Sequence, residues 1–432
     1  MDIIKAQRGT KDILPEQAGR WQTVEEVMRE EAEISGFREI RTPVFEDTGL
    51  FQRSVGETTD VVQKEMYTFL DQGKRSVTLK PEGTAGAVRA YLEHGLFNGP
   101  MPVKLYYLTP CYRYEKAQAG RQREFHQFGV EMFGSGLPIA DAGLIAMAHS
   151  LFGRLCIKGL KLKINSIGCP DCRAKYSQAL KAYFTAHRDR LCETCLSRLD
   201  RNPMRILDCK NPSCGEVAAG APHILDYLCD GCRAHFGQVR ANLDAAGIQY
   251  EVDPTIVRGL DYYTRTVFEF VSDDLGAQST VCGGGRYDGL VEELGGRPTP
   301  ALGFAVGIER LLMIMEAQKV EFPEPDPCEL YIASVGEPAR LEAFRLVQRL
   351  RDCAVEAACD EMGRSLNAQM KYAGKIGAQF TLVLGGDEIA SGTGIVKNMK
   401  TGEKKKVDLK DDFPGQFAAI STEAGDNDDL KF

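Results

Sequence analysis

The sequence has no run of apolar residues long enough to cross a membrane, and its first residues lack the hydrophobic stretch of a secretory signal. It also lacks an excess of positive charge, since 53 lysines and arginines stand against 61 aspartates and glutamates, for a net charge of -8. We therefore expect a cytoplasmic protein with no membrane partner. The acidic total argues mildly against a nucleic-acid partner but does not exclude a local basic surface.

The rest of the composition is that of an ordinary globular chain. Its 432 residues, 43% hydrophobic and 26% charged, suffice for two or three domains with substantial cores. In the reducing cytoplasm, the 14 cysteines should be thiols or metal ligands rather than disulfides.

Residues 103 to 133 predict two antiparallel strands joined by a long polar loop that contains Gly120. Because side chains alternate along a strand, Phe125, Gln127 and Glu131 should share one face, with Gly129 leaving room between them. Charged residues lie near the loop, namely Arg113, Glu115, Arg121 and Arg123. The hairpin could hold a phosphorylated ligand, with guanidinium groups on phosphates and Phe125 under a base, or it could be a solvated hairpin with scattered charges.

The same residues resemble a known motif. Arg113-x-Glu115 followed by Arg121-x-x-x-Phe125 resembles motif 2 of the class II aminoacyl-tRNA synthetases, and the surrounding residues 112–115 and 125–131 are most similar to the histidyl-tRNA synthetase family. The resemblance implies a catalytic domain with an antiparallel sheet that binds ATP and L-histidine.

The N-terminal region predicts a helix from about Glu16 to Ser35, ended by Gly36, and then a strand over 37–45 with Pro43 near its end. This order resembles motif 1 of class II synthetases, which implies a homodimer interface. Residues 79–85 predict a strand end, a turn and the start of a helix that runs to about His94. Glu82 and Thr84 could be a turn and cap set. By resemblance to the Pro-Glu-Gly-Thr of the family, they would hold the α-amino group of histidine.

Two further segments carry the resemblance downstream. Residues 258–270 predict a glycine turn and a strand, and the sequence Arg258-Gly-Leu-Asp-Tyr262-Tyr263 is nearly restricted to histidyl-tRNA synthetases and their relatives. It implies a catalytic guanidinium at Arg258 and a histidine pocket at the two tyrosines. Residues 282–288 predict a glycine-rich turn that fits no P-loop or dinucleotide fingerprint. Residues 301–312 predict a strand that leads into a helix and resemble motif 3, which implies that Arg310 binds the ATP γ-phosphate.

Eight cysteines form four close pairs in one segment: Cys169 with Cys172, Cys192 with Cys195, Cys209 with Cys214, and Cys229 with Cys232. Two Cys-x-x-Cys pairs suffice for one tetrahedral zinc, so four pairs could bind two structural ions, or the residues could be free thiols. The residues between the pairs are predicted to form helices, and many of them are charged. In the family, an insertion at this place contacts the acceptor arm of tRNA.

Pro323 to Pro327 reads as a stiff linker, and the chain beyond it alternates predicted strands and helices as an α/β module does. The family places its anticodon-binding domain here. Lysines 397, 400, 404, 405 and 406 could supply a local basic surface despite the acidic total.

The resemblance therefore implies an α/β and α+β multidomain chain. We expect a class II antiparallel-sheet catalytic domain at residues 1–165 and 241–325, a small helical insertion at 166–240, and a C-terminal α/β anticodon-binding domain at 328–432. The implied activity is a histidine–tRNA ligase with ATP and Mg²⁺. The alternative is the regulatory subunit of ATP phosphoribosyltransferase, a paralogue without the C-terminal module. The presence of residues 328–412 and of all three arginines, Arg113, Arg258 and Arg310, favours the enzyme.

The resemblance also assigns roles to single residues. Arg113 and Arg258 are the implied catalytic residues. The implied histidine-binding set is Glu82, Thr84, Arg113, Gln127, Glu131, Arg258, Tyr262 and Tyr263. The implied ATP-binding set is Arg113, Glu115, Arg121, Phe125 and Arg310. Gln118, in the motif 2 loop, is a candidate contact for the acceptor end of histidine tRNA.

Overall fold

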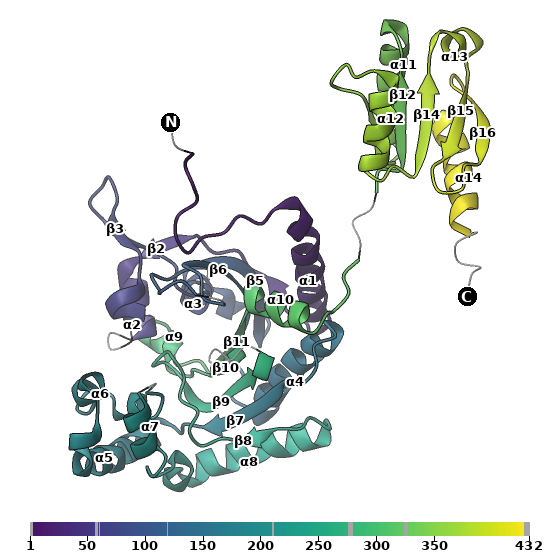
Figure 1. Cartoon of the computed structure of the whole chain (residues 1–432). Coiled ribbons are helices and arrows are strands. Elements are labelled where there is room, and N and C mark those ends of the chain that lie inside the picture. The colour runs from purple at the N-terminus through teal and green to yellow at the C-terminus, as the bar shows by residue number, and fades with distance from the viewer. Residues whose placement is uncertain are drawn as a thin grey trace. The chain divides into compact units, whose positions relative to one another are not determined.

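The computed structural model describes residues 3–56, 59, 61–118, 120–209, 211–274, 280–323 and 327–426. The chain divides into two compact units, residues 1–323 and 324–432 (Figure 1). Residues 324–326 of the expected linker lie outside the described residues.

The first unit is built on an eight-stranded sheet with the order β1-β5-β6-β11-β10-β9-β7-β8. Its strands are β1 (Arg38–Glu39), β5 (Val103–Tyr112), β6 (Glu124–Phe133), β7 (Lys161–Ser166), β8 (Glu251–Val252), β9 (Thr264–Val271), β10 (Thr280–Arg286) and β11 (Ala301–Gly307). Neighbours are antiparallel except at the edges, where β1 pairs with β5 and β8 pairs with β7 in parallel. A small second sheet has the order β2-β4-β3, with β2 (Phe45–Asp47), β3 (Thr68–Leu70) and β4 (Ser76–Leu79).

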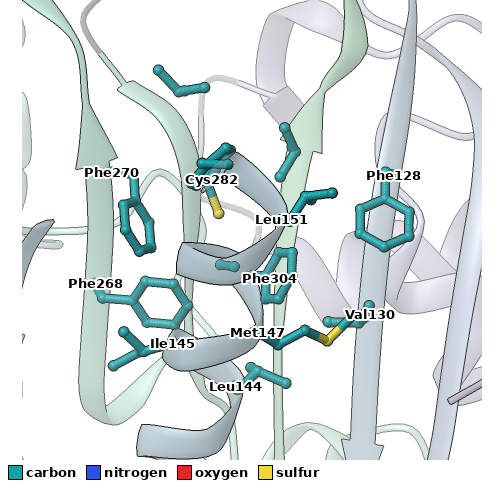
Figure 2. Packing of buried hydrophobic residues seen from close by; sticks show 14 of the residues in the cluster. Phe128, Val130, Leu144, Ile145, Met147, Leu151, Phe268, Phe270, Cys282 and Phe304 are labelled. Atoms are coloured by element: carbon teal, nitrogen blue, oxygen red, sulfur yellow. The ribbon is translucent and has the colours of Figure 1, made fainter. Parts of the chain in front are cut away.

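The helices of the first unit are α1 (Pro15–Ile34), α2 (Thr48–Val55), α3 (Thr84–Glu93), α4 (Pro138–Arg154), α5 (Pro170–Ala186), α6 (Glu193–Arg198), α7 (Pro212–Ala218), α8 (Asp230–Ala245), α9 (Leu290–Glu293) and α10 (Ile308–Ala317). Residues of α1, α4, α8 and α10 share one buried cluster with one face of the large sheet. Figure 2 shows α4 against this face, with Phe128 and Val130 from β6 and Phe268 and Phe270 from β9 beside it. Burial of this apolar surface is the main force that holds the helices on the sheet.

The β5–β6 hairpin has the predicted antiparallel pairing, from Val103 opposite Phe133 to Tyr112 opposite Glu124. On β6, Phe128, Val130 and Met132 point into the helix-covered core. Alternation therefore turns Gln127 and Glu131 to the opposite face, which is where the predicted site residues belong.

Two predictions about the secondary structure of the first unit are wrong. Residues 37–45 do not form one strand: β1 pairs with β5 of the large sheet, whereas β2 begins only at Phe45 and pairs with β4 of the small sheet. Pro43 lies between the two and cannot donate to a strand ladder, which is consistent with the break. Residues 282–286 are not a turn but part of the central strand β10. The glycines there are explained by close packing, because a Cβ at Gly284 would lie 2.4 Å from the Gly303 carbonyl oxygen.

The segment between β7 and β8 has a hydrophobic cluster of its own, formed by residues of α5, α6, α7 and the turns between them. Four of the paired cysteines, Cys172, Cys195, Cys214 and Cys232, belong to it and are almost completely buried. Helix α8 ends this segment: its first turn supplies Cys232 to the cluster, whereas Phe236, Val239 and Leu243 further along the helix pack into the core of the large sheet.

The second unit is the predicted α/β module. Its sheet has the order β13-β12-β14-β15-β16, parallel over the first three strands and antiparallel over the last two pairs. Its elements are β12 (Leu330–Ser334), α11 (Glu337–Arg351), β13 (Ala357–Cys359), α12 (Leu366–Lys375), β14 (Phe380–Leu384), α13 (Gly386–Ser391), β15 (Thr393–Asn398), β16 (Lys404–Asp408) and α14 (Phe413–Asp426). Sequence reasoning missed α13 and α14. No helix among the described residues of either unit combines the length and the apolar character that a bilayer span requires.

Candidate active site

A cavity of about 340 Å³ lies in the first unit and is lined by β6, β10, β11, the start of α3 and residues 258–263. It brings together most of the residues predicted to bind histidine and ATP. Its walls include Glu82, Thr84, Arg113, Glu115, Arg121, Phe125, Gln127, Arg258, Tyr262, Tyr263 and Arg310. Of the selected ATP and histidine residues, only Glu131 is not part of the lining.

Glu82 is held by the helix that follows it. The backbone N–H groups of Thr84 and Ala85 each donate a 2.8 Å hydrogen bond to one of its carboxylate oxygens. Glu82 therefore caps α3, as one of the two readings of this turn predicted, and at the same time faces the cavity. Burial raises the pKa of Glu82, so a cationic group such as an α-amino group would stabilise its charged form.

Glu131 lies directly behind the cavity wall. Thr84 and Tyr107 donate hydroxyl hydrogen bonds of 2.7 and 2.9 Å to its Oε1, and Tyr287 donates to its Oε2. A Cβ on Gly303, which does line the cavity, would lie 2.0 Å from Oε2, so the carboxylate occupies the space above that glycine. Burial raises the pKa of Glu131 to about 8.

The room expected at Gly129 is not there. A Cβ at Gly129 would lie 2.3 Å from the ring of Tyr107, and one at Gly83 would lie 2.2 Å from the same ring. Both glycines are therefore needed to seat Tyr107 beside Glu131, and the glycine that separates Glu131 from the cavity is Gly303. The predicted hairpin places Tyr107 opposite Gly129. The sequence did not show that the Tyr107 side chain would fill the space beside this glycine.

Arg258 reaches the cavity from the segment before β9. Its guanidinium forms an ion pair with Glu269 of β9 and lies over Gly283, where a Cβ would come within 2.2 Å of it. The Thr280 hydroxyl donates a 3.0 Å hydrogen bond to the other oxygen of Glu269. Gly283 therefore has a role within the strand: because it has no side chain, it leaves room for the Arg258 guanidinium against the sheet.

Three arginines converge on the other part of the cavity, and we call Arg113, Arg121 and Arg310 the arginine group. Arg310 donates to the carbonyl oxygens of Gly120 and Thr280, at 3.0 and 2.7 Å. Burial and the nearby positive charges of Arg121 and Arg113 lower the pKa of Arg310. Such a concentration of like charge is stabilised by a polyanion such as a triphosphate.

The remaining residues near the arginine group are an acid and an aromatic ring. Glu115 lies 3.0 Å from Arg121 between Oε2 and Nε, and the Arg113 guanidinium lies 5.3 Å from the centre of the Phe125 ring. Gln118, the candidate tRNA contact, pairs with Arg121 through backbone hydrogen bonds across the tight turn at Gly120.

Sequence reasoning missed several residues of the site. Tyr107 and Tyr287 complete the environment of Glu131, and Arg205 reaches the cavity from the cysteine-rich segment. Glu309 lines it as well and accepts hydrogen bonds from the His126 backbone N–H and from its ring. Alternation along β5 could have indicated Tyr107, but Arg205 is brought there only by the fold.

The eight paired cysteines form two groups of four. Cys169, Cys172, Cys229 and Cys232 form one, and Cys192, Cys195, Cys209 and Cys214 form the other, with all sulfur atoms of a group within 4.8 Å of one another.

A largely antiparallel sheet that carries convergent arginines beside buried carboxylates in one cavity defines the catalytic fold of a class II aminoacyl-tRNA synthetase. Comparisons with known proteins agree. The family model described as "Histidyl-tRNA synthetase" matches residues 9–205 and 215–311, and the one described as "Anticodon binding domain" matches residues 329–413.

Relatives and solved structures point the same way. The histidine–tRNA ligase of Acetivibrio thermocellus is 55% identical over 407 residues, 94% of this chain and 98% of that relative, and that of Clostridium perfringens is 54% identical over 94% and 97%. The crystal structure of apo Staphylococcus aureus histidyl-tRNA synthetase is 40% identical, with a TM-score of 0.82 over 96% of this chain and all of that one. The chain therefore belongs to the histidyl-tRNA synthetase family, and the predicted family and fold class are confirmed.

Proposed function

We propose that this chain catalyses the histidine–tRNA ligase reaction, the activity that the sequence predicts. It activates L-histidine with ATP to histidyl-adenylate and then transfers the histidyl group to the 3′ end of histidine tRNA. The observation that carries this proposal is a single cavity with the buried carboxylate of Glu82 on one part of its wall, that of Glu131 directly behind the wall, and the arginine group on another part. The first part suits an amino acid with a basic side chain, and the second suits a triphosphate.

In the activation step, the histidine carboxylate attacks the α-phosphorus of ATP and pyrophosphate leaves. The protein has little covalent work in such a transfer, so its contribution is positioning and charge stabilisation. We assign Glu82, Thr84 and Gln127 to the α-amino group. Arg113 and Arg258 would act at the α-phosphate, and Arg121 and Arg310 at the outer phosphates. Mg²⁺, bound with ATP, would neutralise further phosphate charge.

We assign Glu131 and Tyr263 to the imidazole of histidine, with Tyr262 completing the wall of that pocket. Phe125 would lie under the adenine, and Glu115 beside it. In the transfer step, the terminal ribose hydroxyl of tRNA attacks the adenylate carbonyl, and Gln118 is the proposed contact to the acceptor end.

The second unit is the proposed anticodon-binding domain. Lys397 and Lys404 lie opposite each other on β15 and β16, which would place positive charge on one edge of the sheet. We also propose a homodimer that assembles through residues 37–45, a cytoplasmic location, and structural zinc on the paired cysteines. Light scattering of the purified protein tests the dimer, which a mass near 48 kDa would contradict, since one chain is 47.7 kDa.

Histidine-dependent exchange of pyrophosphate into ATP tests the activity, because it reports adenylate formation without tRNA. We expect exchange with histidine and none above background with the other amino acids. Folded protein that supports no histidine-dependent exchange would refute the proposal. The alternative, a regulatory subunit without catalysis, is less well supported, because residues 329–413 match an anticodon-binding domain.

A further inference from the structure

The two cysteine groups differ in position, and we name them accordingly. The root group (Cys169, Cys172, Cys229 and Cys232) lies where the insertion leaves β7 and returns through α8, and the outer group (Cys192, Cys195, Cys209 and Cys214) lies within the insertion. In each group, cysteine pairs from two separate places in the chain come together. The pairing is nested: the first pair meets the fourth, and the second meets the third.

The geometry of both groups fits a tetrahedral ion. Four Zn–S bonds of about 2.3 Å in a tetrahedron place neighbouring sulfur atoms about 3.8 Å apart. The Sγ atoms of Cys192 and Cys209 are 3.8 Å apart, and those of Cys169 and Cys172 are 3.5 Å apart. Backbone N–H groups also point at sulfur: Cys229 N–H donates to Cys172 Sγ at 3.1 Å, and Cys192 N–H donates to Cys214 Sγ at 3.2 Å. Such N–H donors stabilise thiolates.

The surroundings indicate a need for these ions. The insertion has a separate hydrophobic cluster within a segment of only about sixty residues, a size at which proteins commonly add metal sites or disulfides to a small core. In the first, second and fourth pairs, the first cysteine directly precedes a helix, namely α5, α6 or α8. The second cysteine of the pair lies in the first turn of that helix. Four thiolates also leave no open coordination position, which is the arrangement of a structural rather than a catalytic zinc.

Three side chains of the insertion hold the segment that carries Arg258 and the two tyrosines. Arg173, next to Cys172, donates to the carbonyl oxygens of Tyr263 and Asp261 at 2.6 and 3.4 Å. The other two, Asn202 and Arg205, lie between the second and third cysteine pairs. Asn202 donates to the Asp261 carboxylate at 3.1 Å, and Arg205 donates to that carboxylate at 3.2 Å and to the Gly259 carbonyl.

We propose that the insertion binds two zinc ions, one in each group, and that the two ions fix the catalytic segment Arg258–Tyr263 from one side. The root ion secures the first turn of α5 and therefore Arg173. The outer ion closes the stretch that presents Asn202 and Arg205. These three are positioning residues for the catalytic segment. This link rests on the proposed function, whereas the ion count does not.

Elemental analysis and X-ray absorption of the full chain, purified without chelator, test the ion count. We expect two zinc per chain, each with four sulfur ligands. Cys172→Ser/Cys232→Ser should lose one ion, and Cys195→Ser/Cys214→Ser should lose the other. The matched controls are Cys156→Ser and Cys353→Ser, since both cysteines are exposed and belong to neither group. They should keep two ions.

Fewer than two zinc per wild-type chain, iron in place of zinc, a mixed ligand shell, or disulfides in the intact mass would each overturn the two-ion assignment. These measurements on the wild type decide the question even where a variant fails to fold. Wild-type protein without zinc that still exchanges pyrophosphate would refute the ions and leave the proposed function standing. Two zinc ions per chain without pyrophosphate exchange would support the two-ion assignment and refute the proposed function.

Arg173→Gln tests the link to the catalytic segment without touching a ligand. We expect two zinc per chain and a KM for histidine raised about tenfold or more, since about 1.4 kcal/mol corresponds to tenfold, while the KM for ATP stays within about twofold. Removal of zinc from the holoenzyme by chelator should produce the same asymmetry, and added zinc should reverse it. Equal loss for both substrates, or no change, would overturn the link.

Discussion

Replacing Arg258 should have two separable effects, because its guanidinium serves two partners. One is Glu269, with which it forms an ion pair whose side chains are 18% and 19% exposed. The other, under the proposed function, is the substrate: the Nε of Arg258 is buried and has no hydrogen-bond partner among the described residues, and the guanidinium lies in the cavity wall. We therefore expect Arg258→Ala to remove a group that acts in the proposed reaction and also to leave Glu269 without its cation.

The magnitudes follow from these two contacts. Removing one partner of a buried ion pair costs about 3–5 kcal/mol. Because both side chains here keep some exposure, and the Thr280 hydroxyl still donates to Glu269, we expect a loss of about 2–3 kcal/mol in unfolding free energy. Loss of one group that stabilises transition-state charge costs about 10² to 10³ in kcat. The KM for histidine should change little by comparison.

The variant Arg258→Ala/Glu269→Gln separates the two effects. It removes the uncompensated carboxylate, so its unfolding free energy should recover to within about 1 kcal/mol of wild type. Its kcat for pyrophosphate exchange should stay about 10² to 10³ below wild type. A matched control is the partly buried pair Arg89–Glu46, at 2.6 Å and away from the cavity. Arg89→Ala should lower stability and leave exchange unchanged.

Recovery of both stability and exchange in the double variant would refute the catalytic role. Arg258 would then serve only to neutralise Glu269 and to hold the strand β9 in place. Chemical denaturation gives the free energy, and single-turnover adenylate formation separates kcat from substrate affinity.

Three further predictions concern other parts of the chain. Glu131→Gln should raise the KM for histidine or lower kcat by about 10- to 100-fold while the KM for ATP stays near wild type, as expected for a lost charge-assisted hydrogen bond; normal histidine activation would make Glu131 a structural residue. The pKa of Glu131 is raised to about 8 in the folded state, so the native state holds a proton that the unfolded state loses above about pH 4.5. Stability should therefore fall between about pH 4.5 and 8, by at most about 1.4 kcal/mol per pH unit, and calorimetry should show a smaller fall for Glu131→Gln. A chain cut after Pro323, at the boundary of the first compact unit, should keep histidine-dependent exchange and lose most aminoacylation; equal loss of both would contradict the domain assignment.

The sequence predicted best where local pattern and fold agree. Alternation on β6 correctly turned Gln127 away from Phe128 and Val130, because one face of that strand is buried under helices. It could not predict Gly283 in a strand, since a run of three glycines normally indicates a turn. The reason for that glycine is Arg258, which is 25 residues earlier in the chain and meets it only through the pairing of β9 with β10.

Contacts between distant segments were the other limit. Four cysteine pairs on a sequence do not say which pairs combine, and the nested arrangement depends on where α8 returns to the sheet. Arg205 shows the same limit, because no local motif distinguishes it from its arginine neighbours. Its role comes from the contact of its side chain with Gly259 and Asp261.

The surroundings of Glu131 suggest how one amino acid could be selected without a proofreading step. An ionised carboxylate offers about four acceptor positions. Thr84 and Tyr107 fill two on Oε1, and Tyr287 fills one on Oε2. The position that remains is on Oε2, above Gly303 at the cavity wall. An imidazole N–H would donate there and favour the ionised form, whereas an apolar side chain of similar size would leave this last acceptor position of a buried carboxyl group unfilled. Rejection of about 10⁴ or more is typical of sites that depend on such a polar partner.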